Sequence, residues 1–483
     1  MTNNKNEKNI VIILCDQLRK DCIGAYGNPL IHTPHIDQLA AEGIRYERCY
    51  VTNPLCMASR FSIFTGMYPR NHGVWSNGVL AKDEGKTLPH YLRRQGYQTA
   101  NVGKMHFEPT GDPTGTMSAE AKVHWQRQAD HEIEQGYWGF DTIKCTIGHS
   151  VVTGNYRQWF LEHGGSDNMF QVDASGAHTG PMHMPETLHC TSYVGEMAVD
   201  YIQEQRDKAR PFFLTVSFPD PHFPFTPPSE SIQNREVHRP IGDERDLETR
   251  PERYRQHYEG CWSRSGLSGV STPDGINEQL TKERIAYTYD MVELIDKNVG
   301  KVVAALKQEG IYEETIIVFL SDHGELLGDH GLWFKGPFLY EGLVNVPFIL
   351  VDQQSRGQVS EALVSTLDLM PTLCDAVEVP VPHYNDGVSL LDSSKQRRQC
   401  LVEYRNGFGD QDFCVYALIN KNYKFIRYED GTYELNDLEK DKEERQNVAS
   451  QSEYQDVVQQ MTNNLLSYLM QTSTNRFPQI CGN

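Results

Sequence analysis

The stretch NIVIILC, residues 9–15, is followed at once by the polar pair Asp16 and Gln17. A continuous apolar run rich in β-branched residues is typical of a strand that is buried on both faces of a parallel sheet. In open α/β sheets, ligands bind just outside the carboxyl ends of the strands. This stretch therefore predicts the fold class and the edge of the sheet at which a site should be sought.

Similar apolar runs, each ending in polar residues, alternate with helical patterns along the chain. Further strands are predicted at residues 44–51, 97–102, 212–218, 315–320 and 346–351. Helices are predicted at residues 34–41, 87–95, 193–208 and 278–307. Strands that alternate with helices are typical of α/β proteins. We predict an α/β fold with a large, mostly parallel central sheet flanked by helices.

The pattern changes after residue 392. Short alternating runs at residues 400–404, 414–420 and 423–428 precede an amphipathic helix near residues 454–470. They predict a smaller C-terminal antiparallel sheet with a closing helix. Because a chain of 483 residues exceeds one ordinary core, two domains are expected. We place them at residues 1–392 and 393–483.

Two stretches of the larger domain break the alternation of strands and helices. They span residues 108–188 and 224–277. Long irregular segments in a compact domain are usually functional, so we interpret both as lids or substrate loops. A surface insertion without a role is the alternative.

Composition limits the classes of partner. Of the 483 residues, 39% are hydrophobic and 23% are charged, which is typical of a soluble globular protein. The formal net charge of -20 disfavours a nucleic-acid or anionic-membrane surface, because both reward basic patches. The polar residues 1–8 and the short apolar run after them predict no signal peptide or membrane span. We expect no nucleic-acid and no membrane partner, and a cytoplasmic location, or a periplasmic one if a leader was removed.

One of eleven scattered cysteines, Cys56, begins the stretch CMASR at residues 56–60. Pro54 before it and Gly66 after it predict a helix with Cys56 at or near its N-terminus. At that end the backbone dipole favours negative charge. For the residue taken alone, a buried cysteine that packs as a small hydrophobe is the alternative. The meaning of Cys56 therefore depends on the groups around it.

Residues that follow the buried strands offer metal ligands. Asp16 with Gln17, and Asp322 with His323, supply two carboxylates, an amide oxygen and an imidazole. Hard cations prefer oxygen ligands, and one imidazole widens the candidates towards Mn²⁺. A turn capped by aspartate is the alternative for either pair alone. Because the predicted strands are parallel, both pairs should meet at one edge of the sheet.

Taken together, the motifs resemble those of the sulfatase branch of the alkaline phosphatase superfamily, in the same order along the chain. The resemblance extends from about residue 9 to about residue 450. The stretches that carry it are Asp16-Gln17, CMASR at 56–60, GKMH at 103–106, Pro221-His222, SDHGE at 321–325 with Lys335, and YELNDLEKD at 433–441.

The resemblance implies that residues 1–392 form a catalytic domain that holds one divalent metal ion. The implied ligands are Asp16, Gln17, Asp322, His323 and the modified Cys56. Calcium is the expected ion. Mn²⁺ and Mg²⁺ are the alternatives, because this chain carries Gln17 where many sulfatases carry Asp, and His323 where many carry Asn. In this family the motif cysteine is oxidised to formylglycine, so a formylglycine-generating maturation enzyme is implied as a partner.

The same resemblance implies how the catalytic residues act. The formylglycine aldehyde hydrates to a diol, and Arg60 would orient this diol and the ligand carboxylates. Lys104 and Lys335 would bind the sulfate oxygens, where charge develops in the transition state. His222, with Lys335, would contact the substrate and protonate the leaving alcohol, and His106 would hydrogen-bond the diol and help to remove its proton.

The predicted function is hydrolysis of a sulfate monoester of a carbohydrate or a small organic alcohol. The substrate would be a small-molecule or oligosaccharide sulfate ester. A phosphonate monoester or phosphodiester hydrolase with the same nucleophile and metal site is the alternative, and Asn77 lies where a loop could bind substrate in such an enzyme. Lys104 and His106 favour the sulfatase. An inactive relative that acts as a binding protein is an alternative of another class.

Overall fold

The computed structural model describes most of the chain. The described residues are 8–112, 114–127, 132–148, 153–170, 179–233, 235–237, 246–258, 278–352, 357–406 and 413–473.

An eight-stranded sheet forms the centre of the protein, in the order β4-β3-β5-β1-β6-β7-β2-β8. Only β7 runs antiparallel to its neighbours. The strands are β1 (Asn9–Asp16), β2 (Ile44–Tyr50), β3 (Gln98–Gly103), β4 (Thr142–Cys145), β5 (Phe212–Pro221), β6 (Thr315–Ser321), β7 (Asn345–Val351) and β8 (Gln358–Ser365). The predicted mostly parallel central sheet is confirmed.

The first strand lies in the middle of this sheet and is buried along its whole length. Because successive side chains of a strand point to opposite faces, Ile10, Ile12 and Leu14 pack in one core cluster. Val11 and Ile13 pack in the other. Burial on both faces explains why residues 9–15 are apolar without alternation.

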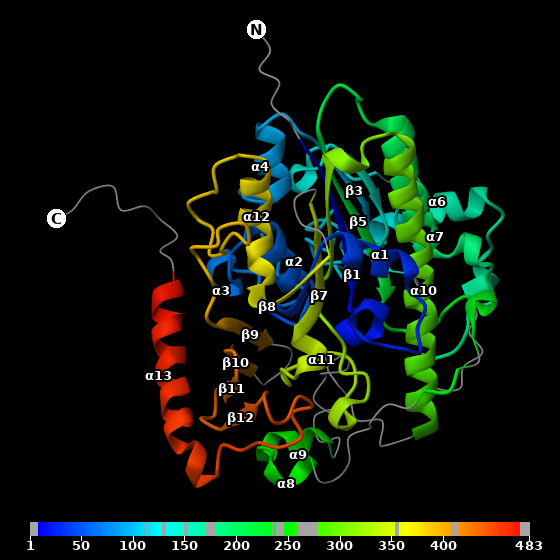
Figure 1. Ribbon diagram of the computed structural model, residues 1–483. Coiled ribbons are helices and arrows are strands. Elements are labelled where there is room, and N and C mark those ends of the chain that lie inside the picture. The colour runs from blue at the N-terminus through cyan, green and yellow to red at the C-terminus, as the bar shows by residue number, and fades with distance from the viewer. Residues whose placement is uncertain are drawn as a thin grey trace.

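Helices cover both faces of the sheet (Figure 1). The first core cluster contains side chains from α2 (Cys56–Thr65), α4 (Leu88–Arg94) and α12 (Leu369–Ala376). The second contains side chains from α1 (Pro34–Glu42), α7 (Cys190–Asp200) and α10 (Glu278–Gln308). The helix predicted at residues 193–208 begins three residues earlier and ends in a π-helical turn, Tyr201–Gln205.

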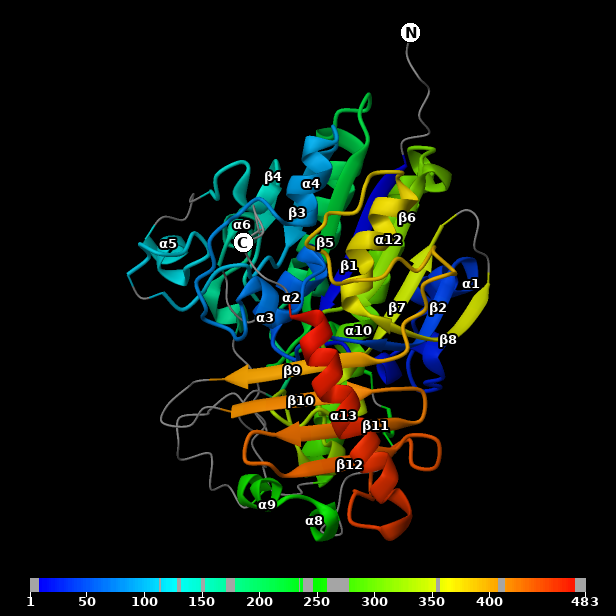
Figure 2. The same cartoon turned by 90° about the vertical axis from the view of Figure 1, so that its left-hand side faces the viewer.

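A second sheet of four antiparallel strands follows in the order β12-β11-β10-β9. Its strands are β9 (Cys400–Asn406), β10 (Phe413–Ile419), β11 (Tyr423–Tyr428) and β12 (Tyr433–Asp437), and α13 (Gln455–Thr472) closes it. Figures 1 and 2 show this sheet beyond the end of β1 that carries Asp16, with α13 lying across it. The smaller antiparallel sheet with a closing helix is confirmed, while the boundary at residue 392 stays a prediction.

The two irregular stretches are partly built of regular elements. The first contains α5 (Lys122–Arg127), β4 and α6 (Asn155–Glu162), so its strand extends the central sheet. The second contains α8 (Asp246–Thr249) and α9 (Glu252–Tyr258), and residues 238–245 and 259–277 lie outside the described residues. Arg250 and Arg253 bind the C-terminal subdomain through Glu434 at 2.7 Å and Glu429 at 2.9 Å. A role of these stretches as lids stays a prediction.

Candidate active site

The carboxyl ends of four parallel strands bring the predicted residues together. These strands are β1, β3, β5 and β6, which are neighbours in the sheet. Their ends deliver Asp16 and Gln17, Lys104 and His106, His222, and Asp322 and His323. Helix α2 adds Cys56 and Arg60, and the loop after β6 adds Lys335. The strand ends therefore converge as the sequence predicted.

Cys56 is the first residue of α2, and every residue of this helix is buried. Gly66 ends the helix in the left-handed conformation, with φ of 64°, as its position in the sequence predicted. The side-chain oxygen of Asn77 accepts a hydrogen bond from the backbone N–H of Met57 at 3.0 Å. Asn77 therefore satisfies a free amide of the first turn. This contact gives Asn77 a structural place next to Cys56, and its predicted contact with substrate stays a prediction.

Four buried side chains offer a divalent metal ion one ligand atom each. These atoms, from Asp16, Cys56, Asp322 and His323, lie within 4.8 Å of one another. The imidazole Nδ1 of His323 lies 2.8 Å from the carbonyl oxygen of Gly324. Since a carbonyl only accepts, Nδ1 carries the proton and Nε2 presents its lone pair to the cluster. Two carboxylates and a neutral imidazole fit a divalent ion.

Gln17 lies beside this cluster with its amide oriented by two partners. Its Nε2 donates to the carboxylate of Glu325, and its Oε1 accepts from Lys335 Nζ at 3.0 Å. The oxygen therefore faces the centre of the site. Glu325 also accepts from the backbone N–H groups of Leu327 and Phe334, so this buried carboxylate holds both Gln17 and the loop that bears Lys335.

Two buried ammonium groups contact members of this cluster. Lys335 Nζ lies 2.9 Å from Cys56 Sγ, and Lys104 Nζ pairs with the carboxylate of Asp16. Burial alone would raise the pKa of the Cys56 thiol, but the ammonium groups of Lys335 and Lys104 hold it well below its ordinary value. The environment of residue 56 therefore stabilises a negatively charged group.

His222 faces Lys335 across the site. Its Nε2 lies 3.0 Å from Lys335 Nζ, and its Nδ1 lies 2.5 Å from the carbonyl oxygen of Phe223. Since an ammonium only donates and a carbonyl only accepts, Nε2 is the acceptor and Nδ1 carries the proton. Burial and the charge of Lys335 lower the pKa of His222 to about 4. The ring is therefore neutral near pH 7 and takes its hydrogen bond from the lysine.

His106 lies close enough to Cys56 for the two side chains to influence each other's pKa. Burial lowers the pKa of His106 to about 4, so this ring is also neutral near pH 7. Its buried Nδ1 meets no hydrogen-bond partner within the described part of the chain. A neutral imidazole next to residue 56 can accept a proton from it.

Arg60 ties three strand ends together from beneath the site. Its Nε donates to Asp322 Oδ2 at 2.8 Å, and its Nη1 donates to the carbonyl oxygen of Lys104 at 2.9 Å and to Ser217 Oγ at 3.0 Å. Nη2 is buried and has no partner among the residues described. The predicted orientation of a ligand carboxylate by Arg60 matches this geometry. Sequence patterns did not single out Ser217, which is an ordinary serine on β5.

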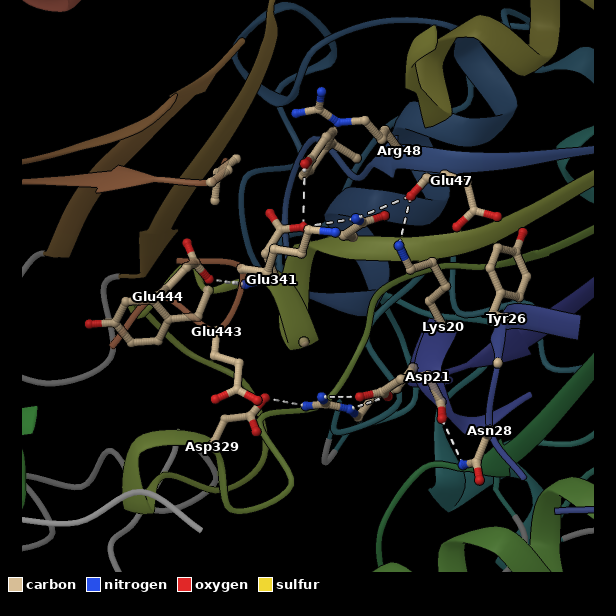
Figure 3. Close-up of a pocket in the computed structure, with 18 of the residues that line it drawn as sticks. Lys20, Asp21, Tyr26, Asn28, Glu47, Arg48, Asp329, Glu341, Glu443 and Glu444 are labelled. Carbon is tan, nitrogen blue, oxygen red and sulfur yellow. Dashed lines mark hydrogen bonds and ion pairs between the residues drawn. The ribbon is translucent and has the colours of Figure 1, made fainter. Parts of the chain in front are cut away.

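A separate cavity of about 680 Å³ lies at the same edge of the sheet, next to the C-terminal subdomain (Figure 3). None of the predicted site residues lines it. Several of its charged groups already bind one another or the backbone. Arg19 pairs with Asp21 and Asp329, each at 2.7 Å, and Lys20 Nζ donates to the carbonyl oxygen of Glu47 at 2.7 Å.

Within the described ranges, the protein has no helix with the length and apolar character of a membrane span.

Two family models match the chain. The Sulfatase model matches residues 8–379. A model described as N-sulphoglucosamine sulphohydrolase, C-terminal, matches residues 328–471. An arylsulfatase of Clostridium perfringens is 31% identical to the chain over 95% of its length and 94% of the relative's length.

Solved structures share the fold over nearly the whole chain. The phosphonate monoester hydrolase of Agrobacterium radiobacter superposes with a TM-score of 0.80 and 22% identity, covering 96% of both chains. A structure described as BT4656 in complex with its substrate D-glucosamine-2-N,6-O-disulfate superposes with a TM-score of 0.71 and 20% identity, covering 96% of this chain and 98% of the other.

Proposed function

Because the chain belongs to the sulfatase family, we propose that it hydrolyses a sulfate monoester of a carbohydrate or small organic alcohol through a formylglycine derived from Cys56. The observation that carries the proposal is the convergence at residue 56. Four possible metal ligands, among them Cys56 itself, lie together there, with Lys335 in contact with Cys56 and Lys104 in contact with Asp16. A cysteine that only packed as a small hydrophobe would not be surrounded by this set of charged groups.

Asp16, Gln17, Asp322 and His323 would hold a divalent metal ion next to residue 56, with calcium the expected ion. Bound there, the ion supplies positive charge that favours the deprotonated form of a hydroxyl at residue 56 and that offsets the charge of a sulfate oxygen. Arg60 holds the Asp322 carboxylate from behind, so this ligand is fixed before substrate arrives. Preorganised groups of this kind stabilise developing charge without reorganising during the reaction.

The two lysines bind the sulfate group. Lys104 contacts Asp16 and Lys335 contacts Cys56. A sulfate that enters between them exchanges these contacts for contacts with its own oxygens. Charge-assisted hydrogen bonds to those oxygens strengthen as negative charge develops there, which is how a cation accelerates the chemical step.

The contact between Lys335 and His222 supplies a proton to the leaving alcohol. Lys335 Nζ is the donor in this contact and His222 Nε2 the acceptor, so the proton that reaches the alcohol oxygen starts on Lys335 or crosses from it to His222. The stacked ring of Phe223, 4.4 Å from His222 between ring centroids, restricts the imidazole to this orientation. On the other side of the site, neutral His106 accepts the proton that residue 56 gives up.

The substrate class follows from the family. The chemistry requires a sulfate ester small or exposed enough to reach a buried cluster. Maturation by a formylglycine-generating enzyme is required before catalysis. The hydrated formylglycine carries two hydroxyl groups on one carbon, and the thiol of Cys56 carries none.

A paired assay tests this function against its alternatives. Matured protein with added Ca²⁺ is given an aryl sulfate, a panel of sulfated sugars and an aryl phosphonate ester. We expect hydrolysis of sulfate esters in preference to the phosphonate, and loss of this activity in Cys56→Ala. Cys49→Ala is the matched control, because Cys49 is also buried and lies on β2. A preference for the phosphonate supports the phosphonate hydrolase, and inactivity towards all esters supports a binding protein.

A further inference from the structure

One buried carboxylate gathers the backbone of the loop that leaves β3. Glu120 is 1% exposed, and its Oε2 accepts a hydrogen bond from the N–H of His106 at 2.7 Å. Its Oε1 accepts from the N–H groups of Phe107 at 2.8 Å and Glu108 at 3.1 Å. The hydroxyl of Tyr137 also donates to Oε1, at 3.0 Å. Four donors therefore converge on one side chain.

The loop needs an external support because of its backbone shape. Gly103 has φ of 102°, and a Cβ at this position would lie 1.9 Å from the carbonyl oxygen of Ser217. His106 has φ of 56° although it carries a side chain. A left-handed conformation persists at such a residue only where the surrounding structure imposes it. Three consecutive amides that cannot pair within the sheet are satisfied by Glu120 instead.

The same loop contacts the active site through Lys104 and brings His106 beside Cys56. Lys104 Nζ pairs with the Asp16 carboxylate, and the carbonyl oxygen of Lys104 accepts from Arg60 at 2.9 Å. The His106 imidazole lies close to Cys56. Any shift of the His106 amide moves the ring that faces residue 56. A carboxylate that touches neither substrate nor residue 56 therefore controls the placement of two groups that do.

We propose that Glu120 is a positioning residue that fixes Lys104 and His106 relative to residue 56. The proposal rests on the proposed function, because those two residues are the ones that bind sulfate and accept the proton. It also assigns a role to part of the irregular stretch of residues 108–188, because Glu120 lies in this stretch and binds the loop that follows β3. Glu108 completes this link, because its carboxylate accepts from the N–H of Ala119 at 2.7 Å.

The test uses the full-length matured protein and single and double variants of it. Glu120→Gln replaces one acceptor oxygen by a donor that faces backbone N–H groups. Asp296→Asn is the matched control, since Asp296 is also buried and accepts from the backbone N–H groups of His35 and Ile36. Glu120→Asp retains the charge but shortens the reach, and it replaces Glu120→Gln if that variant does not fold. Conversion of Cys56 is quantified in each preparation, so that rates refer to matured molecules.

We expect Glu120→Gln to lower kcat by about a hundredfold, the scale of a catalytic group misplaced by one ångström, while Asp296→Asn changes kcat little. If Glu120 acts through the loop, adding Glu120→Gln to His106→Ala lowers kcat far less than it does in the wild type. Hydrogen exchange of residues 106–108 should accelerate in Glu120→Gln and not in Asp296→Asn.

Three results would overturn the proposal. They are a kcat in Glu120→Gln no lower than in Asp296→Asn, losses that multiply in the double variant, and unchanged exchange at residues 106–108. The wild-type rate separates this outcome from failure of the proposed function. A wild-type protein that hydrolyses no ester contradicts the function, while exchange still reports whether Glu120 holds the loop.

Discussion

The buried charges around Cys56 and those around Lys424 are arranged in different ways. Lys424 is fully buried and binds Glu341 at 2.7 Å and Glu444 at 2.9 Å. Lys424 pairs with both carboxylates of this second cluster, which joins β11 to α11 (Glu341–Val344). Around Cys56, lone pairs and ammonium groups from four strand ends face one common point. Buried charges that pair with one another, as around Lys424, hold elements of the fold together. Groups that point to one common position, as around Cys56, can bind a ligand there.

The largest effect should follow from Lys335→Met, which removes a cation from the first cluster. We expect kcat/KM for a sulfate ester to fall about a thousandfold, the cost of deleting a donor at developing charge. The unfolding free energy should change little, because Lys104 and Arg60 still neutralise the carboxylates. Steady-state kinetics and thermal unfolding of one preparation measure both quantities. An activity loss below tenfold would contradict the proposed difference between the two clusters. A loss of unfolding free energy as large as that expected for Lys424→Met would also contradict it.

Lys424→Met should have the opposite signature. It leaves the buried Glu444 and the partly exposed Glu341 without their cation, which should cost about 3 kcal/mol of unfolding free energy. The kcat of the folded protein should stay within about threefold of wild type, since residues that share no partners act independently. Urea unfolding monitored by circular dichroism gives the free energy.

Lys440→Met is the control for this loss, because the Lys440 side chain is 73% exposed in the same subdomain. Its effect on the unfolding free energy should be much smaller than that of Lys424→Met, because an exposed ion pair contributes little to stability. Equal losses in the two variants would show that the Lys424 cluster does not hold the subdomain.

A smaller effect on stability should follow from removal of metal. Chelation should abolish hydrolysis and lower the unfolding free energy by about 2.7 kcal/mol for an ion present at a hundredfold excess over its Kd. Added Ca²⁺ should restore both, and Mn²⁺ and Mg²⁺ are compared beside it. Because the clusters are separate, Lys424→Met should lose the same amount on chelation as wild type. Unchanged stability and activity after chelation would mean that Asp16, Asp322 and His323 hold no essential ion.

The sequence predicted the strand ends well because burial on both faces leaves a strong pattern. Residues 9–15 and 315–320 are continuous apolar runs, so Asp16 and Asp322 mark where they end. Strand β8 left no such pattern, because only its last three residues are buried. Strand β12, with the sequence YELND, contains a single aliphatic residue. The antiparallel direction of β7 depends on its pairing with β2 and β6, which no local pattern encodes.

The grouping of the candidate site residues could be predicted for a related reason, since they are chemically distinctive and most of them follow strands. The supporting carboxylates could not be predicted equally well. Glu325 is the last residue of the motif SDHGE at residues 321–325, so its place in the sequence indicated a role. Glu120 stands in an irregular stretch and binds backbone amides, and backbone amides have no sequence signature. Asn77 was predicted near the site, and it lies there, where it accepts from the backbone N–H of Met57 in the first turn of α2; its contact with substrate stays a prediction.

The state of residue 56 tests the central claim most directly. Trypsin releases residues 49–60 as one peptide that contains Cys49 and Cys56, so each cysteine is an internal reference for the other. Mass spectrometry of alkylated protein from its native host should find Cys49 alkylated and residue 56 converted to an aldehyde. Alkylated thiols at both positions in a preparation that hydrolyses sulfate esters would contradict the account.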